Sequence, residues 1–334
     1  MNKLKVGIIG LGVGLKHLNC FEKNEFTEVV AVCDKNKKKF KLIKKNIVRY
    51  RDAFELIKDP NVDLVSICSN DDDHFKQIIF SIKHKKNIFC EKPICLNLKE
   101  YQEIKKKLSR NKIFFSTNFN LRTTPLFNEL KNKLDKNKLG NVFTIEAGYE
   151  SGRLFKITKG WRGKIKNYSL ISGGMIHMID LIFWLSNFLK KKNKINFYTI
   201  GNNLCVKKNQ TSVDDNINCL LKINNINVYI KASLGCVTPH FHSLKVYGSK
   251  GTFIHDFKYK GYFFKKKEKL IFTETKSDYP GNYKHLIIDE FIKKVFYKKN
   301  KKNKRDIKDI LKITYLALKF QKALEKNKKI SLNV

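Results

Sequence analysis

The first 120 residues alternate short, almost wholly apolar segments with longer amphipathic ones. Strands that are apolar along their whole length are typical of a parallel sheet with both faces covered, and amphipathic helices of this length supply the crossovers between such strands. The pattern predicts an α/β domain with a doubly wound parallel sheet, the Rossmann arrangement. The expected strands are residues 5–10, 28–33, 62–68, 87–93 and 112–117.

The pattern changes after this half of the chain. Runs of strands that follow a βαβ half indicate a second domain of α+β type, with a large, mostly antiparallel open sheet. The expected elements are a helix around 124–136, a strand near 141–149, a helix around 174–187 and strand-rich segments from 194 to 273.

Two helices are expected to close the chain, at 282–298 and 306–326. The Lys- and Asn-rich segment 298–304 between them is expected to be a solvated loop. We expect one domain over 1–121 and a second over 122–334.

The chain carries 69 Lys and Arg residues against 30 Asp and Glu, a formal net charge of +39. Seven of the basic residues are Arg, the side chain suited to bidentate contacts with bases, and the lysines are spread over nearly every segment. This distribution favours a solvated, lysine-rich surface over a nucleic-acid-binding face. We therefore expect no nucleic-acid partner.

No segment reaches the roughly 18 uncharged apolar residues that a membrane helix needs. The N-terminal residues lack the small-residue cleavage site of a secretory signal. The eight cysteines form no CxxC pair, and several lie in apolar, strand-like segments, as expected for free thiols in a reducing compartment. These features predict a cytoplasmic protein without a membrane partner.

A glycine-rich turn joins the first expected strand to the first helix. Glycine lets the backbone turn tightly and approach a pyrophosphate, which then faces the amides at the helix start. The third small position of the GxGxxG pattern is Leu15, with an additional glycine at Gly14. The predicted dinucleotide contacts in this turn are Gly10, Leu11, Gly12, Val13 and Gly14.

Asp34 lies 24 residues after Gly10, at the end of the second expected strand. An acidic side chain in that place accepts hydrogen bonds from the adenosine ribose and repels a 2′-phosphate. Lys35 and the lysines at 37–39 would soften that repulsion. We therefore expect NAD as the cofactor, with NADP as the alternative.

Lys92 ends the expected strand 87–93, locked between Glu91 and Pro93. Ligands of open α/β sheets bind at the carboxyl edge of the strands. An ammonium group there would polarise a substrate hydroxyl or carbonyl, or relay a proton if burial lowers its pKa. Lys92 is therefore a predicted catalytic residue, whereas the other lysines are expected to be solvated.

Ser69 and Asn70 follow the strand 62–68 and precede three acidic residues and His74. Acids beside a histidine would suit a metal, but a polar loop in which an acid caps the next helix is the simpler interpretation. We expect Ser69 and Asn70 to line the cofactor cleft and His74 to begin the helix.

In the second domain, Gly173 and Gly174 precede a helix on which His177 and Asp180 share a face. A lone histidine on an apolar helix is usually a satisfied core residue. The glycine pair leaves room for a ligand and Asp180 could orient the ring, which favours a catalytic histidine.

Residues 239–242 read Pro-His-Phe-His, which places His240 and His242 on one face of a strand. No third ligand is evident in the sequence. We therefore favour a structural or substrate-rim role over a metal site, and predict no metal.

Taken in order, these motifs resemble those of the Gfo/Idh/MocA oxidoreductases. The resemblance implies that 1–121 is an NAD(P)-binding Rossmann domain. It also implies that 122–334 is an α/β domain that takes the substrate and mediates a homo-oligomer, a dimer or tetramer, through its sheet. The matching segments are KVGIIGLGVGLKHL, VCD, SICSNDDDH, CEKPICLN, NFNLRTTP, LGNVFTIEAGY, GWRG, GGMIHMIDLIFWL and VYGSKGTF.

The resemblance maps the family's lysine onto Lys92 and its histidine onto His177. Many relatives carry an aspartate four residues before that histidine, where this chain has Gly173. Tyr168 or Asp180 could replace it, or His177 could work with Lys92 alone. The expected cofactor contacts are Gly10, Leu11, Gly12, Val13, Gly14, Asp34, Ser69, Asn70, His74, Glu91, Lys92 and Asn120, and the expected substrate contacts are Arg122, Trp161, Arg162, Tyr168 and His177.

The implied reaction is reversible hydride transfer between nicotinamide and a carbinol or carbonyl carbon of a sugar, an inositol or a sugar derivative such as a nucleotide-sugar. His177 would accept the hydroxyl proton while Lys92 stabilises the developing negative charge. Two alternatives remain: a dinucleotide-binding scaffold without turnover, and a basic nucleic-acid-binding protein.

Overall fold

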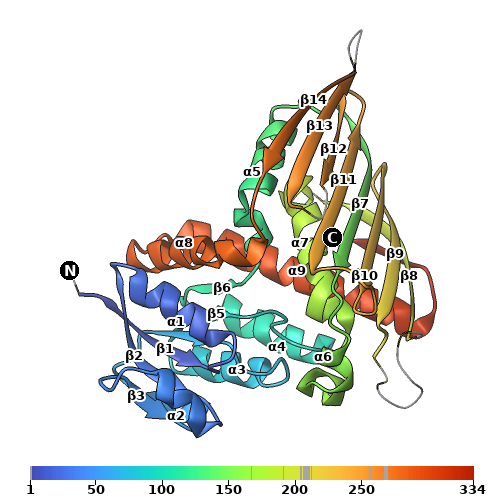
Figure 1. Cartoon of the computed structure of the whole chain (residues 1–334). Helices are drawn as coiled ribbons and strands as arrows, with labels where there is room; N and C mark the ends of the chain where they lie inside the picture. The colour runs from blue at the N-terminus through green and yellow to red at the C-terminus, as the bar shows by residue number, and fades with distance from the viewer. Residues whose placement is uncertain are drawn as a thin grey trace. The chain divides into compact units, whose positions relative to one another are not determined.

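The computed structural model describes residues 2–166, 168–190, 192–203, 205, 211, 213–255, 258–266 and 270–334. The chain divides into two compact units (Figure 1). The first unit consists of Met1–Asn120 with Tyr283–Thr314, and the second of Leu121–Asn282 with Tyr315–Val334. Helix α9 (Asn300–Lys326) begins in the first unit and ends in the second.

The first unit is built on a six-stranded parallel sheet in the order β3-β2-β1-β4-β5-β6. This is the Rossmann order, whose direction reverses between β1 and β4, and it confirms the predicted fold. β3 was not predicted, because its three residues are exposed or half-buried and form no apolar run. The strands are β1 (Leu4–Ile9), β2 (Thr27–Cys33), β3 (Val48–Tyr50), β4 (Leu64–Ile67), β5 (Asn87–Cys90) and β6 (Phe115–Thr117).

The helices of the first unit include one from the far end of the sequence. Helix α8 (Lys284–Phe296) buries Ile288, Phe291 and Ile292 in the same core as the strand residue Phe89. Burying side chains of this size contributes about 1.5–3 kcal/mol each, which ties α8 to the sheet. The others are α1 (Gly14–Lys23), the 3₁₀ helix η1 (Lys37–Leu42), α2 (Ala53–Lys58), α3 (His74–Lys83) and α4 (Leu98–Ser109).

The segment 298–304 is exposed, as predicted, except at Asn303, but the prediction of a loop was wrong over most of its length, because α9 already begins at Asn300. The buried Asn303 side chain accepts a hydrogen bond from the amide of Phe115 at 3.1 Å and donates one to the carbonyl of Ile113 at 3.0 Å. These bonds satisfy the backbone beside β6, so this polar segment forms a helix packed on the sheet.

The second unit contains a nine-stranded sheet in the order β14-β13-β12-β11-β7-β10-β9-β8-β15. All neighbouring strands are antiparallel except β7 and β10, so the predicted large, mostly antiparallel sheet is confirmed. The strands are β7 (Val142–Glu150), β8 (Lys194–Asn202), β9 (Asn216–Ile223), β10 (Ile226–Ser233), β11 (Phe241–Gly248), β12 (Gly251–His255), β13 (Lys260–Lys266), β14 (Leu270–Lys276) and β15 (Ile330–Asn333).

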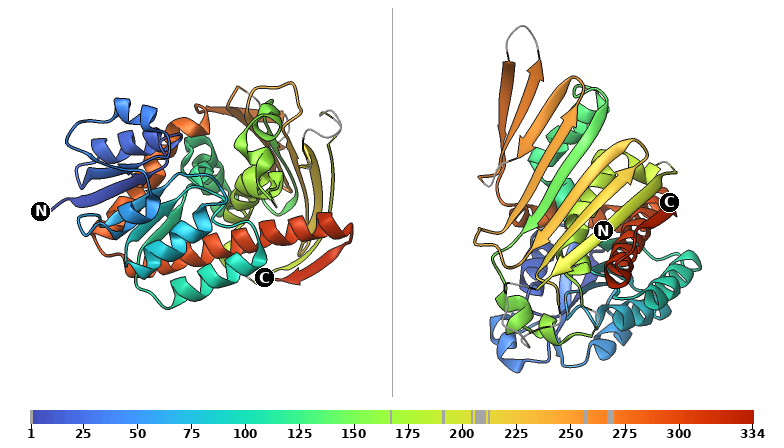
Figure 2. Two further views of the ribbon diagram at one scale, coloured as in Figure 1. Left: turned by 90° about the horizontal axis from the view of Figure 1, so that it is seen from below. Right: turned by 90° about the vertical axis from the view of Figure 1, so that its right-hand side faces the viewer.

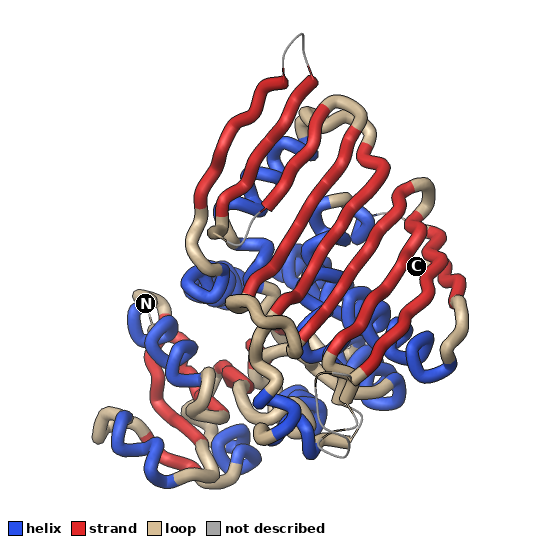
Figure 3. Tube along the Cα trace, turned by 45° about the vertical axis from the view of Figure 1, so that its right-hand side comes forward, coloured by secondary structure: helices blue, strands red, loops and turns tan. Residues whose placement is uncertain are grey.

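Helices cover one face of this sheet and leave the other uncovered (Figures 2 and 3). Phe127 of α5 meets the ring of His255 on β12, and Phe320 of α9 meets Phe197 on β8. The helical elements are η2 (Asn120–Thr123), α5 (Pro125–Asp135), α6 (Phe155–Thr158), η3 (Trp161–Lys164), the π-helical η4 (Ile171–Met175), α7 (Ile176–Leu185), η5 (Phe188–Lys190) and η6 (Pro280–Tyr283).

Within the described residues, no helix is both long and apolar enough to cross a membrane. In the same part of the chain, no three His, Cys, Asp or Glu side chains gather as they would around a metal ion. All eight cysteines are free thiols, and five of them are buried.

Candidate functional site

The glycine turn between β1 and α1 has the geometry that a diphosphate needs. Gly10 has a φ of 87°, and a Cβ at this position would lie 2.5 Å from the carbonyl oxygen of Cys68, so glycine is required. A Cβ on Gly12 would meet no atom within 4 Å, which leaves that side of the turn open. Gly14 begins α1, and a Cβ there would lie 3.1 Å from the side chain of Ile8. Gly14 therefore allows the close helix–strand packing usually provided by the third glycine.

Asp34 follows β2, and its carboxylate is held by three donors. Oδ2 accepts from the amide of Leu11 at 2.7 Å and from Lys39 Nζ at 2.8 Å, while Oδ1 accepts from the amide of Asn36 at 2.8 Å. Burial raises the pKa of Asp34, but Lys39 and the two amides outweigh it and lower that pKa overall. The carboxylate is thus ionised and fixed in position. Together with the open glycine turn and the amides at the start of α1, it fits the adenosine side of a dinucleotide.

Lys92 lies two residues beyond β5, is half-buried, and is joined to Pro93 by a cis peptide bond. The backbone is fixed on both sides of it. The carbonyl of Cys90 accepts a hydrogen bond from Thr117 Oγ1 at 2.8 Å, and the carbonyl of Pro93 lies 2.7 Å from His74 Nδ1. A lysine on a loop held in this way has few backbone positions open to it.

His74 is the first residue of α3, as predicted, and its ring joins two loops of the sheet edge. Besides its contact with the loop that carries Lys92, its Nε2 lies 3.2 Å from the carbonyl oxygen of Ser69. The Ser69 hydroxyl donates to Gln77 at 2.7 Å, Asn70 is exposed, and the buried Asn120 follows β6. The fold therefore brings Ser69 and His74 to the loop that bears Lys92.

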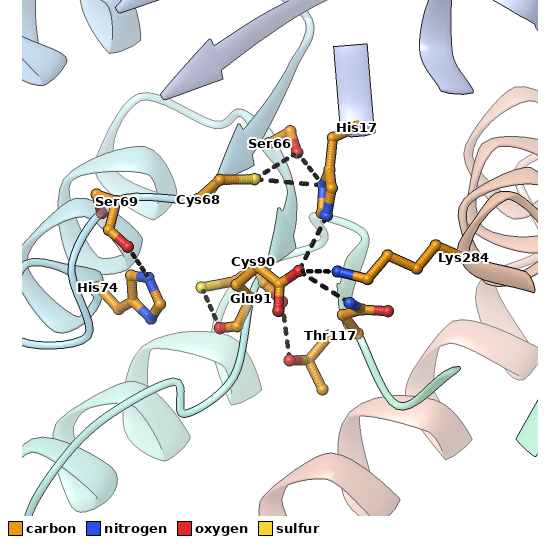
Figure 4. A network of polar contacts seen from close by, with 10 residues as sticks. His17, Ser66, Cys68, Ser69, His74, Cys90, Glu91, Thr117 and Lys284 are labelled. Carbon is orange, nitrogen blue, oxygen red and sulfur yellow. Dashed lines mark hydrogen bonds and ion pairs between the residues drawn. The ribbon is translucent and has the colours of Figure 1, made fainter. Parts of the chain in front are cut away.

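The carboxylate of Glu91 is the centre of a buried network that the sequence interpretation missed (Figure 4). Its Oε1 lies 3.1 Å from His17 Nε2, 2.8 Å from Asn118 Nδ2 and 2.9 Å from Lys284 Nζ. His17 comes from α1, Asn118 follows β6 and Lys284 begins α8. Sequence separations of 74 and 193 residues gave no local sign of the two ion pairs.

The two cations in this network both stabilise the central carboxylate. Burial raises the pKa of Glu91, but Lys284 and His17 outweigh it and hold that pKa well below its usual range. Burial lowers the pKa of His17, but Cys68 and Glu91 outweigh it and raise that pKa to about 9. The site therefore holds an ionised carboxylate between an imidazolium and an ammonium group at neutral pH.

In the second unit, His177 lies in the first turn of α7, directly after the π-helical η4. Its buried ring is stacked on Tyr149 of β7, with the centroids 6.3 Å apart, and lies 6.0 Å from the ring of His242. A Cβ on Gly174 would lie 2.7 Å from the Tyr149 ring, so the glycine lets η4 approach β7. The predicted histidine is thus one member of an aromatic cluster.

Tyr168 occupies the space that a side chain on residue 173 would need. A Cβ on Gly173 would lie 2.1 Å from the Tyr168 hydroxyl and 2.6 Å from its Cζ. An aspartate at 173 would therefore collide with the buried phenol as it stands. The phenol thus brings a hydroxyl group into the space beside residue 173.

Arg122 and Asp180 form an ion pair. The guanidinium Nε lies 3.0 and 2.9 Å from the two carboxylate oxygens, and a further contact joins Arg122 Nη2 to Oδ1. The Asp180 side chain is 1% exposed and that of Arg122 19%. Trp161 and Arg162 are adjacent on η3, with the guanidinium 4.2 Å from the indole centroid. The pairing with Asp180 fixes Arg122 beside α7.

The His177 cluster contains four other aromatic residues, Tyr149, His240, His242 and Tyr279. A structural or substrate-rim role was expected for the two histidines, whereas the two tyrosines were not singled out. His240 Nδ1 lies 2.7 Å from the Tyr279 hydroxyl, and the His240 and His242 rings are 4.8 Å apart. Burial, together with Tyr279, raises the pKa of Tyr149 to about 12. The Pro-His-Phe-His segment was the available signal, but nothing in the sequence showed which helix its rings would face.

Two family models match the chain. The model described as "Oxidoreductase family, NAD-binding Rossmann fold" covers residues 4–119, and that of the "GFO/IDH/MocA C-terminal domain" covers residues 127–254.

Named relatives point the same way. The chain is 30% identical over 146 residues to a myo-inositol 2-dehydrogenase of Thermotoga maritima, a match that covers 42% of this chain and 44% of that protein. It is 28% identical over 222 residues to a glucose-6-phosphate 3-dehydrogenase of Bacillus subtilis, covering 63% and 62%. The chain spans about half the length of the first curated relatives that it matches.

Solved structures agree in fold. A levoglucosan dehydrogenase in complex with NADH and levoglucosan superposes with a TM-score of 0.85 over 99% of both chains, at 15% identity. The two family models together span most of the chain, in the order of the two sheets. The protein therefore belongs to the Gfo/Idh/MocA family of oxidoreductases, whose N-terminal Rossmann domain binds NAD.

Proposed function

We propose that the protein is a dehydrogenase that oxidises a secondary hydroxyl group of an inositol or a sugar with NAD. In this proposal, residues 1–121 bind the coenzyme and 122–334 carry the substrate. The main support for this proposal is the position of Lys92. It is half-buried on a loop whose backbone is hydrogen-bonded on both sides, and it lies at the same sheet edge as the open glycine turn and Asp34. Relatives named for inositol and glucose 6-phosphate support the substrate class.

The coenzyme, when bound, supplies the hydride acceptor. The glycine turn would hold its diphosphate against the start of α1, and Asp34 would accept hydrogen bonds from its adenosine ribose. The ionised state of Asp34 favours NAD, because a 2′-phosphate would meet a negative charge. Ser69, Asn70, His74, Glu91 and Asn120 complete the proposed coenzyme side of the site.

In this proposal His177 transfers the proton and Lys92 stabilises charge on the substrate oxygen. His177 accepts the proton of the substrate hydroxyl group as hydride leaves the carbinol carbon. Lys92 stabilises the negative charge that develops on that oxygen, and in the reverse direction the same two groups return the proton to a carbonyl. General acid–base assistance of this kind contributes about 10²–10⁴-fold to a rate.

We further propose that Tyr168 takes the part of the aspartate that many relatives carry at the position of Gly173. Its hydroxyl group lies 2.1 Å from the position that a Cβ at residue 173 would take, and a phenol can hydrogen-bond a substrate hydroxyl group. Arg122, Trp161 and Arg162 are the other proposed substrate contacts. Tyr168→Phe should lower kcat/KM for the polyol by roughly tenfold to hundredfold, the value of one or two hydrogen bonds, and leave the Kd of NAD unchanged.

A paired substitution tests this replacement. Gly173→Asp alone should be poorly active because its side chain collides with Tyr168. The double variant with Tyr168→Ala and Gly173→Asp should recover activity relative to either single change. Equal activity of Tyr168→Phe and the wild type would exclude a role for the hydroxyl group.

The proposed function is tested by following NAD reduction spectroscopically with myo-inositol, levoglucosan, glucose 6-phosphate, sugar acids and nucleotide-sugars. At least one polyol should be oxidised, and Lys92→Met and His177→Ala should each lower kcat by about 10²-fold or more. Tight NAD binding without turnover on any of these compounds would indicate a dinucleotide-binding scaffold. Retention on DNA at physiological salt would revive the nucleic-acid alternative.

We also propose a cytoplasmic homo-oligomer, a dimer or tetramer, assembled through the uncovered face of the large sheet. Exposed Tyr198, Ile200 and Leu220 support a contact surface there, and eight free cysteines suit a reducing compartment.

A further inference from the structure

We propose that His17 and Lys284 are positioning residues that act on Lys92 through the carboxylate of Glu91. The inference rests on the proposed role of Lys92. It assigns a part in the reaction to α8, an element of the chain nearly two hundred residues away from the motif that bears the lysine.

The geometry joins Glu91 to three elements at once. In Figure 4, His17 reaches the carboxylate from α1 and Lys284 reaches it from α8. The side chains are 0%, 11% and 17% exposed for His17, Glu91 and Lys284, so water does little to weaken these pairs. Asn118 adds a neutral hydrogen bond to the same oxygen.

Fixing this carboxylate also fixes the backbone that leads into Lys92. The amide of Glu91 donates to the carbonyl of Ile67 at 2.8 Å, and its carbonyl lies 3.1 Å from Cys90 Sγ. The side chain and both backbone groups of Glu91 are therefore held by hydrogen bonds. These bonds restrict the orientation of the peptide group that joins Glu91 to Lys92. Small displacements at a reacting group can cost about 10²-fold in rate, so a loosened Glu91 should be visible in kcat.

An alternative explanation is that the network serves only to bind α8 to the sheet. The two explanations differ in what they predict, because α8 already buries Ile288, Phe291 and Ile292 in the core. If the ion pair is only structural, breaking it should lower the stability of the protein and leave the kcat of the folded protein unchanged. A positioning pair changes kcat and the chemical environment of the Lys92 amine in protein that remains folded.

The test compares Lys284→Met with Lys284→Arg, which keeps the charge, and with Lys293→Met, an exposed lysine of the same helix. Each full-length variant is first checked for folding by circular dichroism. Kinetics are measured with NAD and the polyol that the wild type oxidises. Separately, without coenzyme or substrate, the rate at which N-acetoxysuccinimide acetylates Lys92 is measured by mass spectrometry.

For Lys284→Met we expect kcat to fall roughly tenfold to hundredfold, with the Kd of NAD within about threefold of the wild type. Its Lys92 acetylation rate should differ from that of the wild type by about threefold or more, reflecting the moved amine. Lys284→Arg should restore most of kcat, and Lys293→Met should match the wild type. Glu91→Gln keeps the shape and removes the charge, so it should lower kcat and change the Lys92 acetylation rate as Lys284→Met does, and it replaces that variant if Lys284→Met fails to fold. Because Glu91 is itself a proposed coenzyme contact, the Kd of NAD is not used to judge this variant.

The inference is overturned if folded Lys284→Met or Glu91→Gln matches Lys293→Met in both kcat and Lys92 acetylation. Failure of the proposed function gives a different result. In that case either the wild type oxidises none of the compounds or Lys92→Met turns over like the wild type, while acetylation of Lys92 in the other variants still reports whether Glu91 positions it.

Discussion

At the scale of single residues, Asp34 shows how one side chain serves two tasks. Its carboxylate bonds the amide of Leu11 and so braces the glycine turn, while it stands at the strand end where an adenosine ribose would lie. Lys39 sits on the same oxygen and favours the ionised form. The pair places a cation close to the position of a 2′-phosphate.

Coenzyme preference should therefore change when Asp34 is removed. Asp34→Ala is expected to raise the Kd of NAD roughly tenfold to hundredfold, which corresponds to the loss of about 1.5–3 kcal/mol for a charged hydrogen bond. The Kd of NADP should rise less than that of NAD, or fall, because Lys39 loses its carboxylate partner and can then pair with the 2′-phosphate. Calorimetric titration with both coenzymes measures this, with exposed Glu25→Ala as the control. An equal loss for both coenzymes would show that Asp34 only braces the turn.

At the scale of elements, the buried network ties α1, β4, β5 and α8 together through His17. The groups that face its ring are Ser66 of β4, Cys68 directly after β4 and Glu91 beyond β5, and Glu91 also contacts Lys284 of α8. The contacts with Cys68 and Glu91 outweigh burial and raise the pKa of His17 from 6.5 to about 9. Folding therefore favours the protonated ring.

Stability should depend on pH in a direction set by that shift. A raised pKa contributes stability in full below pH 6.5 and loses it as the pH rises through about 9. The free energy of unfolding in urea should therefore fall between these pH values more steeply for the wild type than for His17→Gln. Equal slopes for the two proteins would show that His17 does not hold an extra proton in the folded state.

Also at this scale, the sequence predicted elements better than the contacts between them. Apolar periodicity predicted most strands of the first sheet, and glycine spacing predicted the turn. The sequence patterns gave no sign of β3, whose residues bury little. They also predicted a solvated loop at 298–304, which is exposed except at Asn303 but is helical from Asn300, and Asn303 bonds the backbone beside β6. Polar composition alone does not distinguish a solvated residue from one that satisfies buried amides.

At the candidate site, the residues that follow the sheet edge were predictable and their partners were not. Lys92, Asp34 and His74 lie next to apolar runs, so their positions at the end of a strand or the start of a helix could be predicted from the sequence. Lys284 and His17 reach Glu91 through tertiary packing over long sequence separations. Likewise, only the structure shows that Tyr168 fills the space at Gly173.

At the scale of the whole molecule, the large sheet carries helices on one face (Figure 3). The outward positions of β8 and β9 include the exposed apolar residues Tyr198, Ile200 and Leu220. Leu220 is 62% exposed and lines a shallow hollow together with Tyr198 and Tyr229. Exposed apolar groups of this kind suit a contact between two sheets.

The oligomer should therefore depend on this face. We expect the protein to sediment as a dimer or tetramer, and Leu220→Glu to shift it towards the monomer with its fold intact. Lys302→Glu, an exposed residue of α9, is the control. A wild-type protein that sediments as a monomer, or a Leu220→Glu variant of unchanged mass, would contradict assembly through this face.

Deuterium labelling follows the proposed hydride transfer from the carbinol carbon to the coenzyme. The polyol that the enzyme oxidises is labelled at its carbinol C–H and incubated with NAD, and the coenzyme product is analysed by mass spectrometry. With the wild type we expect one deuterium on the nicotinamide ring of the reduced coenzyme. With Lys92→Met we expect the amount of labelled coenzyme formed in the same time to be lower by about 10²-fold. Reduced coenzyme without deuterium, or equal transfer by both proteins, would contradict the proposed hydride transfer.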